Sequence, residues 1–168
     1  SYNELYILRM NIIVIGPDYR GYQHASYQYE FLEALKDKSD NYYHYSETRD
    51  IDINKLYNKA NFIPDVVFFN HGWLLDNPDI SRITYIKVNK IFKNTSNKVK
   101  KVLFLNKEYT RLEEKQTHIK KSNYDLIFTH LHYFSSLNKT NQKIIFLPLA
   151  CSYKNLNSNS FKKLEERK

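Results

Sequence analysis

The chain has 168 residues, of which 42% are hydrophobic and 26% charged. This composition excludes a disordered or fibrous chain and suits one domain with its own core. The formal net charge of +8 attracts anions such as nucleotide phosphates, acidic glycans or nucleic acid. The single cysteine, Cys151, cannot form an intramolecular disulfide, and no run of about 18 apolar residues predicts a membrane span. We therefore expect a cytoplasmic protein with no membrane span.

Short apolar runs, rich in β-branched and aromatic residues, recur along the chain. Continuous apolar runs of this length are typical of strands that are buried on both faces of a parallel sheet. The five predicted strands are Ile12–Ile15, Val66–Phe69, Val102–Leu105, Leu126–Phe128 and Ile144–Leu147. A weaker strand candidate lies at Tyr42–Tyr45.

The polar segments between these runs are long enough for crossover helices. Tyr27, Phe31 and Leu35, joined by Leu32, form an amphipathic stripe that predicts the first helix. The other helices are predicted over Asp52–Asn61 with Asp52 as N-cap, within Ile80–Phe92, and from a capping box of Thr110 and Glu113 to about Lys121.

Alternating strands and helices predict the α/β class, as a single doubly wound Rossmann-like domain with a mainly parallel sheet. We place this domain at residues 11–153. Residues 1–10 form an N-terminal extension, and residues 154–168 form a polar C-terminal tail or linker.

The loop after the first predicted strand, "GPDYRG", resembles a phosphate-binding loop only superficially. Gly16 and Gly21 have P-loop spacing, but Tyr22 and Gln23 stand where a P-loop needs Lys and Ser or Thr, which excludes a Walker-type NTPase. Asp18 stands where the dinucleotide-binding fingerprint needs its second glycine, which argues against an NAD or FAD domain.

Two interpretations of this loop stay open. In the first, the glycines serve only the geometry of the turn and Tyr19 packs on the surface. In the second, Tyr19, Arg20 and Tyr22 face a cleft and contact a ligand, because open α/β sheets bind ligands at the carboxyl ends of their strands.

Polar and aromatic residues follow the other predicted strands and should meet at the same edge. His71, followed by Gly72 and Trp73, is the best candidate for a general base, since imidazole titrates near neutral pH, although a purely structural histidine is the alternative. Glu108 is either a base, a hydroxyl-binding carboxylate or an acidic residue favoured before a helix. His130 and His132 alternate, so at most one of them faces the cleft.

Other chemistries have weaker signals. No H-E-x-x-H or C-x-x-C motif occurs, so no metal site is predicted, and Cys151 has no paired histidine signature. The basic runs at Asn97–Lys101 and Thr117–Lys121 read as a solvated turn and a helix end, so no specific nucleic-acid site is predicted.

Three segments together resemble a known family. "PDVVFFNHGW", "KVLFLNKEYTRLEEKQTHIKKSNYDLIFTHL" and "IIFLPLACS" resemble the amino-terminal, acceptor-side half of GT-B glycosyltransferases. The closest likeness is to the CgeB-like spore-maturation group. The likeness covers about Asn11 to Tyr153 and rests on patterns at the strand ends.

The resemblance implies a metal-independent enzyme without a cofactor that transfers a sugar from a nucleotide-sugar donor to a glycan or other hydroxyl acceptor. It implies a second, donor-binding Rossmann-like domain in the same or another chain, since these residues end about where that domain should begin. His71 or Glu108 would take the proton from the acceptor. The implied substrate-binding residues are Gly16, Asp18, Tyr19, Arg20, Gly21, Tyr22, Gly72, Trp73 and His130.

Two alternatives to a transferase remain. The domain could be a non-catalytic Rossmann-like module that binds a saccharide, a nucleotide or a partner protein, since aromatic faces suit sugar rings and bases alike. A weaker alternative is nucleic-acid binding driven by the +8 charge, which predicts a steep dependence on salt.

Overall fold

A six-stranded parallel sheet forms the centre of the computed structural model, which describes residues 9–18, 20, 26–46, 53–70, 98–105, 112–132 and 142–147. All five strand pairings are parallel, and the strand order is β2-β1-β3-β4-β5-β6. The strands are β1 (Asn11–Ile15), β2 (Asn41–Tyr45), β3 (Val66–Phe69), β4 (Lys100–Phe104), β5 (Leu126–Thr129) and β6 (Ile144–Phe146).

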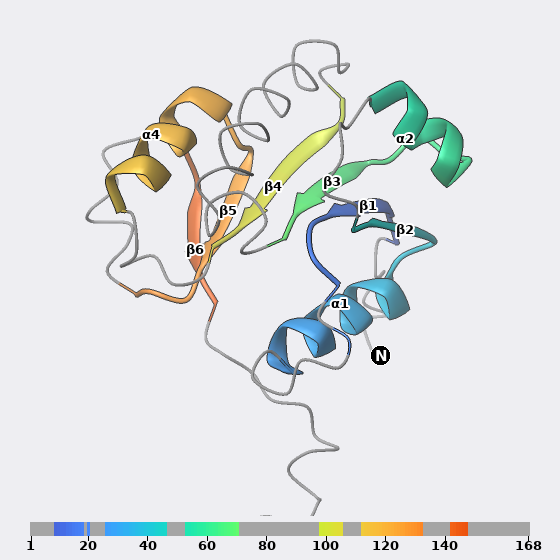
Figure 1. The fold of residues 1–168 in the computed structure, drawn as a ribbon, viewed down its shortest axis with the longest axis horizontal. Helices are drawn as coiled ribbons and strands as arrows, with labels where there is room; N and C mark the ends of the chain where they lie inside the picture. The colour runs from blue at the N-terminus through green and yellow to red at the C-terminus, as the bar shows by residue number, and fades with distance from the viewer. Residues whose placement is uncertain are drawn as a thin grey trace, which may run out of the picture.

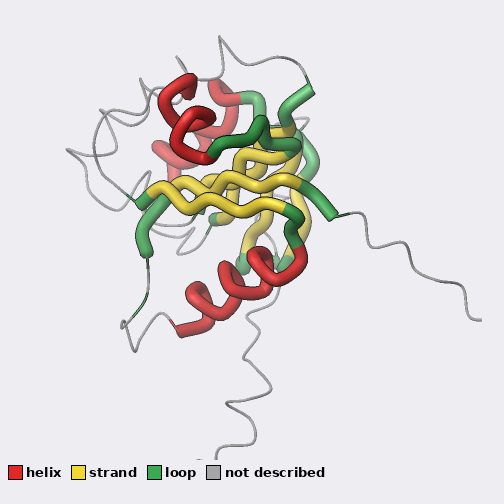
Figure 2. Tube along the Cα trace, turned by 90° about the vertical axis from the view of Figure 1, so that its right-hand side faces the viewer, coloured by secondary structure: helices red, strands yellow, loops and turns green. Residues whose placement is uncertain are grey.

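The described helices lie on both faces of the sheet. They are α1 (Ser26–Lys38), α2 (Ile53–Ala60) and α4 (Leu112–Ser122). Figures 1 and 2 show α1 below the sheet and α2 and α4 above it. Because the chain goes from β1 outward to β2 and then returns past β1 to β3, the strand order reverses at β1 and β3. This is a doubly wound α/β sheet, as the sequence predicts.

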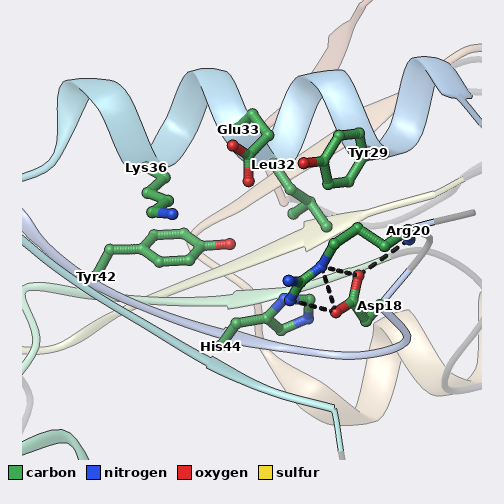
Figure 3. Close-up of a pocket in the computed structure, with 8 residues that line it drawn as sticks. All are labelled: Asp18, Arg20, Tyr29, Leu32, Glu33, Lys36, Tyr42 and His44. Atoms are coloured by element: carbon green, nitrogen blue, oxygen red, sulfur yellow. Dashed lines mark hydrogen bonds and ion pairs between the residues drawn. The ribbon is translucent and has the colours of Figure 1, made fainter.

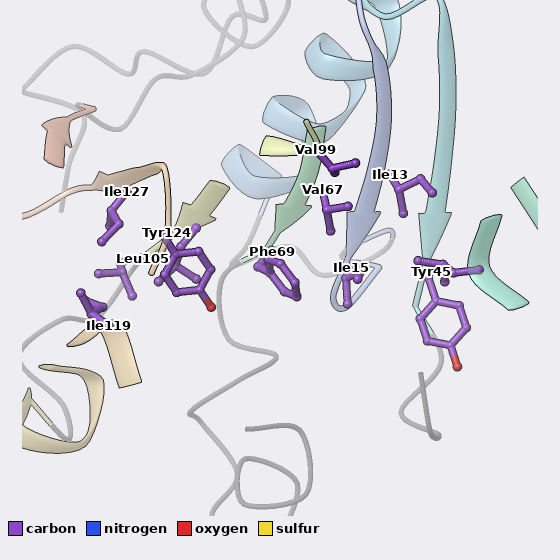
Figure 4. Close-up of a cluster of buried hydrophobic side chains, with 12 residues drawn as sticks. Ile13, Ile15, Tyr45, Val67, Phe69, Val99, Leu105, Ile119, Tyr124 and Ile127 are labelled. Carbon is purple, nitrogen blue, oxygen red and sulfur yellow. The ribbon is translucent and has the colours of Figure 1, made fainter. Parts of the chain in front are cut away.

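The central strands β1, β3 and β4 bury alternate side chains in two separate cores. On the α2 and α4 face, Ile13 and Ile15 pack with Phe69, Leu56 and Ile119 in a cluster of buried residues, much of which is shown in Figure 4. On the α1 face, Ile12, Val14, Phe68, Val102 and Phe104 pack against Leu32. Burial on both faces is why the strands read as continuous apolar runs.

Helix α1 packs against its face of the sheet through aromatic contacts. The Phe31 ring stacks on that of Phe104, with ring centroids 4.8 Å apart and an interplanar angle of 7°. Phe31 also packs at a tilt on Phe68, at 5.6 Å. Leu32 is buried beside them and Leu35 is partly buried. The stripe predicted from the sequence therefore faces the core, although the Tyr27 side chain lies outside the described residues.

Two aspartates tie neighbouring strands together at the amino edge of the sheet. The Asp65 carboxylate accepts a hydrogen bond from the backbone N–H of Asn11 at 2.8 Å. The Asp125 carboxylate accepts one from the backbone N–H of Lys101 at 2.8 Å and pairs with Lys100 at 3.0 Å. Lys100 and Lys101, predicted to lie in a solvated turn, are instead the first two residues of β4, where Asp125 holds them at the edge opposite the carboxyl ends.

The strand predictions are confirmed with shifted ends. The largest shift is in β4, which starts at Lys100 and not at Val102, because the Lys100 N–H donates to the Asp65 carbonyl at 2.8 Å. The weak candidate at residues 42–45 is a full strand at the edge of the sheet. The caps at Asp52 and Thr110, the helix predicted within Ile80–Phe92 and the tail at residues 154–168 lie outside the described residues.

Candidate functional site

The loop after β1 is held by close backbone contacts at the carboxyl edge of the sheet. The Gly16 N–H donates to the Tyr45 carbonyl at 3.0 Å. Its carbonyl lies 2.9 Å from His44 Nε2, and since a carbonyl can only accept, Nε2 carries the proton of that imidazole. Gly16 has a φ of 147°, a backbone conformation that suits glycine far better than residues with a side chain.

Asn70, the first residue after β3, fills the space beside Gly16. It is 1% exposed, its N–H donates to the Ile15 carbonyl at 2.8 Å, and its side-chain amide donates to the Pro17 carbonyl at 3.3 Å. A Cβ atom on Gly16 would lie 2.7 Å from the Asn70 Cβ. The β1 and β3 ends therefore approach as closely as a glycine allows, at the point where the strand order reverses.

Asp18 and Arg20 form a pair within the same loop. Arg20 Nη2 and Nε donate to Asp18 Oδ2 at 2.6 and 3.0 Å, and the Arg20 N–H donates to Oδ1 at 3.0 Å. The hydrogen bond from the Arg20 side chain lowers the pKa of the Asp18 carboxyl, so it is ionised at neutral pH. The pair fixes the turn and presents an arginine whose side chain is 73% exposed.

Beside this pair lies a pocket of about 150 Å³ between α1 and β2, which we call the α1–β2 pocket (Figure 3). Three kinds of residue build it: the loop pair, one side of α1, and the two β2 side chains that face the helix. Its lining residues are Asp18, Arg20, Tyr29, Leu32, Glu33, Lys36, Tyr42 and His44.

Burial sets the protonation of the two β2 residues in this pocket. It raises the pKa of the Tyr42 hydroxyl, with the Glu33 charge adding to the effect, so Tyr42 remains a hydrogen-bond donor. Burial lowers the pKa of His44, while its bond to the Gly16 carbonyl and the Asp18 charge oppose that shift. His44 is therefore a neutral, hydrogen-bonded imidazole at pH 7.

The structure brings together three of the site residues predicted from the sequence, namely Gly16, Asp18 and Arg20. It places His130 elsewhere on the same edge. The remaining predicted residues, Tyr19, Gly21, Tyr22, His71, Gly72, Trp73 and Glu108, lie outside the described residues.

His130 follows β5 and is held in place by two contacts. Its Nδ1 lies 2.6 Å from the Leu147 carbonyl, and its ring meets the Phe104 ring edge-on at 4.9 Å. Three strand intervals separate β1 from β5 in the sheet, a distance of about 14 Å at about 4.8 Å per interval. A ligand touching both His130 and the loop after β1 must therefore be longer than one sugar ring.

Six of the eight pocket residues are not among the site residues predicted from the sequence, and Leu32 is predicted only as part of the apolar stripe of α1. The spacing of the five polar and aromatic ones indicates that they share a site. Tyr29, Glu33 and Lys36 follow one another at intervals of four and three residues on α1, so they share one side of the helix. Tyr42 and His44 alternate on β2 and so share one face. The missing information was that β2 lies directly beside the helix that precedes it.

A scan against protein-family models, a search of curated proteins and a search of solved structures each found no match to this chain. Within the described ranges, no group of three or more His, Cys, Asp or Glu side chains is placed to hold a metal ion. None of the described helices combines the length and the apolar character that crossing a bilayer requires.

Proposed function

We propose that this domain binds a hydroxyl-bearing ligand at the carboxyl edge of its sheet, and that it does so as the acceptor-side domain of a GT-B glycosyltransferase. One observation carries the binding part of the proposal. The strand order reverses between β1 and β3, and the loop after β1 presents Asp18 and Arg20 there, beside a pocket. Doubly wound sheets bind their ligands at such a reversal.

The transferase part is supported by the resemblance at the strand ends and by the chain position of two residues. His71 directly follows Asn70, which the structure places one strand from Gly16. In the proposed reaction, His71 or Glu108 accepts the proton of the acceptor hydroxyl as its oxygen attacks the anomeric carbon, and the nucleoside diphosphate leaves with the bonding electrons. A second Rossmann-like domain would hold the nucleotide-sugar.

The binding part can be tested on the chain as it is. Glycan acceptors and nucleotide-sugars are titrated into ¹⁵N-labelled protein while backbone amide shifts are recorded. We expect saturable shifts at Gly16, Asp18 and Asn70, with the amides of Asp65 and Asp125 at the opposite edge unchanged. Shifts confined to the opposite edge, or none with any of these ligands, would contradict the proposal.

The transferase part of the proposal is tested by measuring a turnover rate. Sugar transfer is measured with the donor-binding domain present, and His71→Ala should lower turnover by about 10²-fold or more, as expected for the loss of a general base. The matched control is His132→Ala, which removes an exposed histidine after β5. Equal rates for His71→Ala and the unsubstituted protein would remove His71 from the mechanism.

A non-catalytic binding module is the second candidate, and a specific observation favours it. Two of the histidines that the structure describes next to the carboxyl edge, His44 and His130, bond to backbone carbonyls, of Gly16 and Leu147. Both imidazoles thus have a structural role. Ligand binding without any transfer, whatever second domain is supplied, would identify the chain as such a module.

A further inference from the structure

The α1–β2 pocket carries an inference about the class of ligand. The inferred ligand class deepens the proposed function. It rests on that function because the pocket adjoins the same loop after β1. In Figure 3 the side chains of α1 point down toward β2, and the Asp18–Arg20 pair closes the pocket at one end. Its ligand must satisfy the size, the charge and the hydrogen-bonding groups of this lining.

The size restricts the ligand to a small molecule. The pocket volume of about 150 Å³ falls below the roughly 300–1,000 Å³ typical of sites for drug-sized molecules. A whole nucleotide-sugar or an oligosaccharide cannot be contained in it. One sugar ring, or a molecule of similar size, is the scale of ligand that fits.

The charge of the lining favours an uncharged ligand. Two carboxylates, of Asp18 and Glu33, are balanced by the cations Arg20 and Lys36. The guanidinium of Arg20 is already engaged by Asp18 through contacts of 2.6 and 3.0 Å. A phosphate would have to compete with that carboxylate and would also face Glu33, so the lining does not favour an anion.

The hydrogen-bonding groups match a ligand with several hydroxyls. Four polar groups of the lining have no hydrogen-bond or ion-pair partner within the described part of the chain: the hydroxyls of Tyr29 and Tyr42, the Glu33 carboxylate and the Lys36 ammonium. The carboxylate can only accept, the ammonium can only donate, and the hydroxyls can do both. A sugar ring carries neighbouring hydroxyls that both donate and accept, and so offers a complementary group to each of these kinds.

The apolar part of the lining supports the same class. Leu32 is 3% exposed, and the Tyr42 ring lies half-buried on β2, held edge-on against the His44 ring at a centroid distance of 6.4 Å. An aromatic face beside hydrogen-bonding groups suits the C–H face and the hydroxyl rim of one sugar ring. We propose that the α1–β2 pocket is a subsite for a single uncharged sugar ring, held by Tyr29, Glu33, Lys36 and Tyr42.

The test uses the unmodified chain and defined probes. The methyl glycosides of glucose, galactose, mannose and N-acetylglucosamine are titrated separately, with inorganic phosphate and glycine as competing classes. We expect at least one glycoside to give saturable shifts of the Glu33, Tyr42 and His44 resonances. Binding of phosphate or glycine at these residues with no response to any glycoside would overturn the sugar assignment.

Substitution localises the effect. Glu33→Gln keeps the shape of the side chain but weakens its acceptor, and should weaken glycoside binding at least about tenfold, as hydrogen bonds to a charged group imply. Asp37→Asn is the matched control, since it removes the same charge from an exposed position of α1 outside the lining. Equal weakening by both variants, or none by Glu33→Gln, would overturn the proposal.

The chemical shift of the Asn70 amide reports binding at the β1–β3 edge, whereas the shifts of Tyr42 and His44 report binding in the pocket. A glycan acceptor that shifts Asn70 but leaves Tyr42 and His44 unchanged would overturn the pocket assignment and support binding at the edge. If no ligand shifts the resonances of Asn70, Tyr42 or His44, both the pocket assignment and the proposed binding at the edge are wrong. Shifts at Tyr42 and His44 alone, abolished by Glu33→Gln, would support the sugar pocket and contradict binding at the β1–β3 reversal.

Discussion

At the scale of single residues, the buried histidine of α4 shows how burial determines protonation. His118 is 1% exposed; its Nε2 lies 2.6 Å from the Tyr124 hydroxyl and its Nδ1 3.4 Å from the Ser122 hydroxyl. Burial lowers the pKa of His118 from 6.5 to about 4, because a charged imidazole loses its hydration in the core. Its role is structural, and it lies on the face opposite the α1–β2 pocket.

This histidine should make the protein less stable in mild acid. Between pH 6.5 and about 4 the unfolded chain binds a proton at His118 that the folded chain does not, so the free energy of unfolding falls as pH drops through this window. The fall attributable to His118 is at most about 3 kcal/mol. Urea unfolding at pH 7.5 and 4.5 measures it.

The substitution His118→Gln removes the titrating group and retains a polar side chain. We expect this variant to be less stable than the unsubstituted protein at pH 7.5 but to lose less stability on going to pH 4.5. His132→Gln, at an exposed position after β5, is the matched control for a His-to-Gln substitution outside the core. If His118→Gln loses as much free energy of unfolding between pH 7.5 and 4.5 as the unsubstituted protein, other groups cause the acid sensitivity.

At the scale of elements, the contact between Gly16 and Asn70 determines how closely the ends of β1 and β3 approach. The positive φ of Gly16 and the 2.7 Å separation of its would-be Cβ from the Asn70 Cβ both penalise a side chain. We expect Gly16→Ala to destabilise the fold by about 2–3 kcal/mol, combining steric overlap and backbone strain. Chemical denaturation measures this loss.

A double-mutant cycle separates the two causes. Asn70→Gly removes the Cβ that an alanine at position 16 would meet, so part of the loss from Gly16→Ala should disappear in the Asn70→Gly background. The part due to the positive φ should remain. Strictly additive effects of the two substitutions would show that no steric overlap couples these positions.

The burial of each strand explains which strand predictions from the sequence are confirmed. The runs at β1, β3, β4 and β5 are continuous and apolar because both of their faces are covered. Strand β2 was only a weak candidate, since an edge strand that lines a pocket alternates Tyr42 and His44 with the core-facing Tyr43 and Tyr45. Its polar side is the part that carries the proposed sugar subsite.

At the scale of the whole molecule, stability should decrease from the centre of the sheet to its edges. Strands β1 and β3 are flanked on both sides and almost wholly buried, whereas β2 and β6 each have one neighbour and several half-buried residues. We expect amides of β2 and β6 to exchange about 10²-fold or more faster than those of β1 and β3. Native-state hydrogen exchange measures this ratio.

Ligand binding connects this gradient to function. A sugar ring between α1 and β2 would hold Tyr42 and His44 in place, so a saturating glycoside should slow exchange in β2 and leave β6 unchanged. Equal slowing at both edges would indicate a general stabilisation of the fold and would not support a ligand seated on β2.

The sequence by itself determined the class of fold, the strand positions and the loop after β1. These depend on local patterns: apolar runs, helical spacing, and glycines that allow a turn. Only the tertiary structure decided that β2 lies outside β1, that Asn70 lies against Gly16, and that α1 and β2 enclose a pocket while His130 lies across the sheet, about 14 Å from the end of β1. Gly16 and Asn70 are separated by tens of residues along the chain, and the order of the strands, which no local pattern encodes, brings them together.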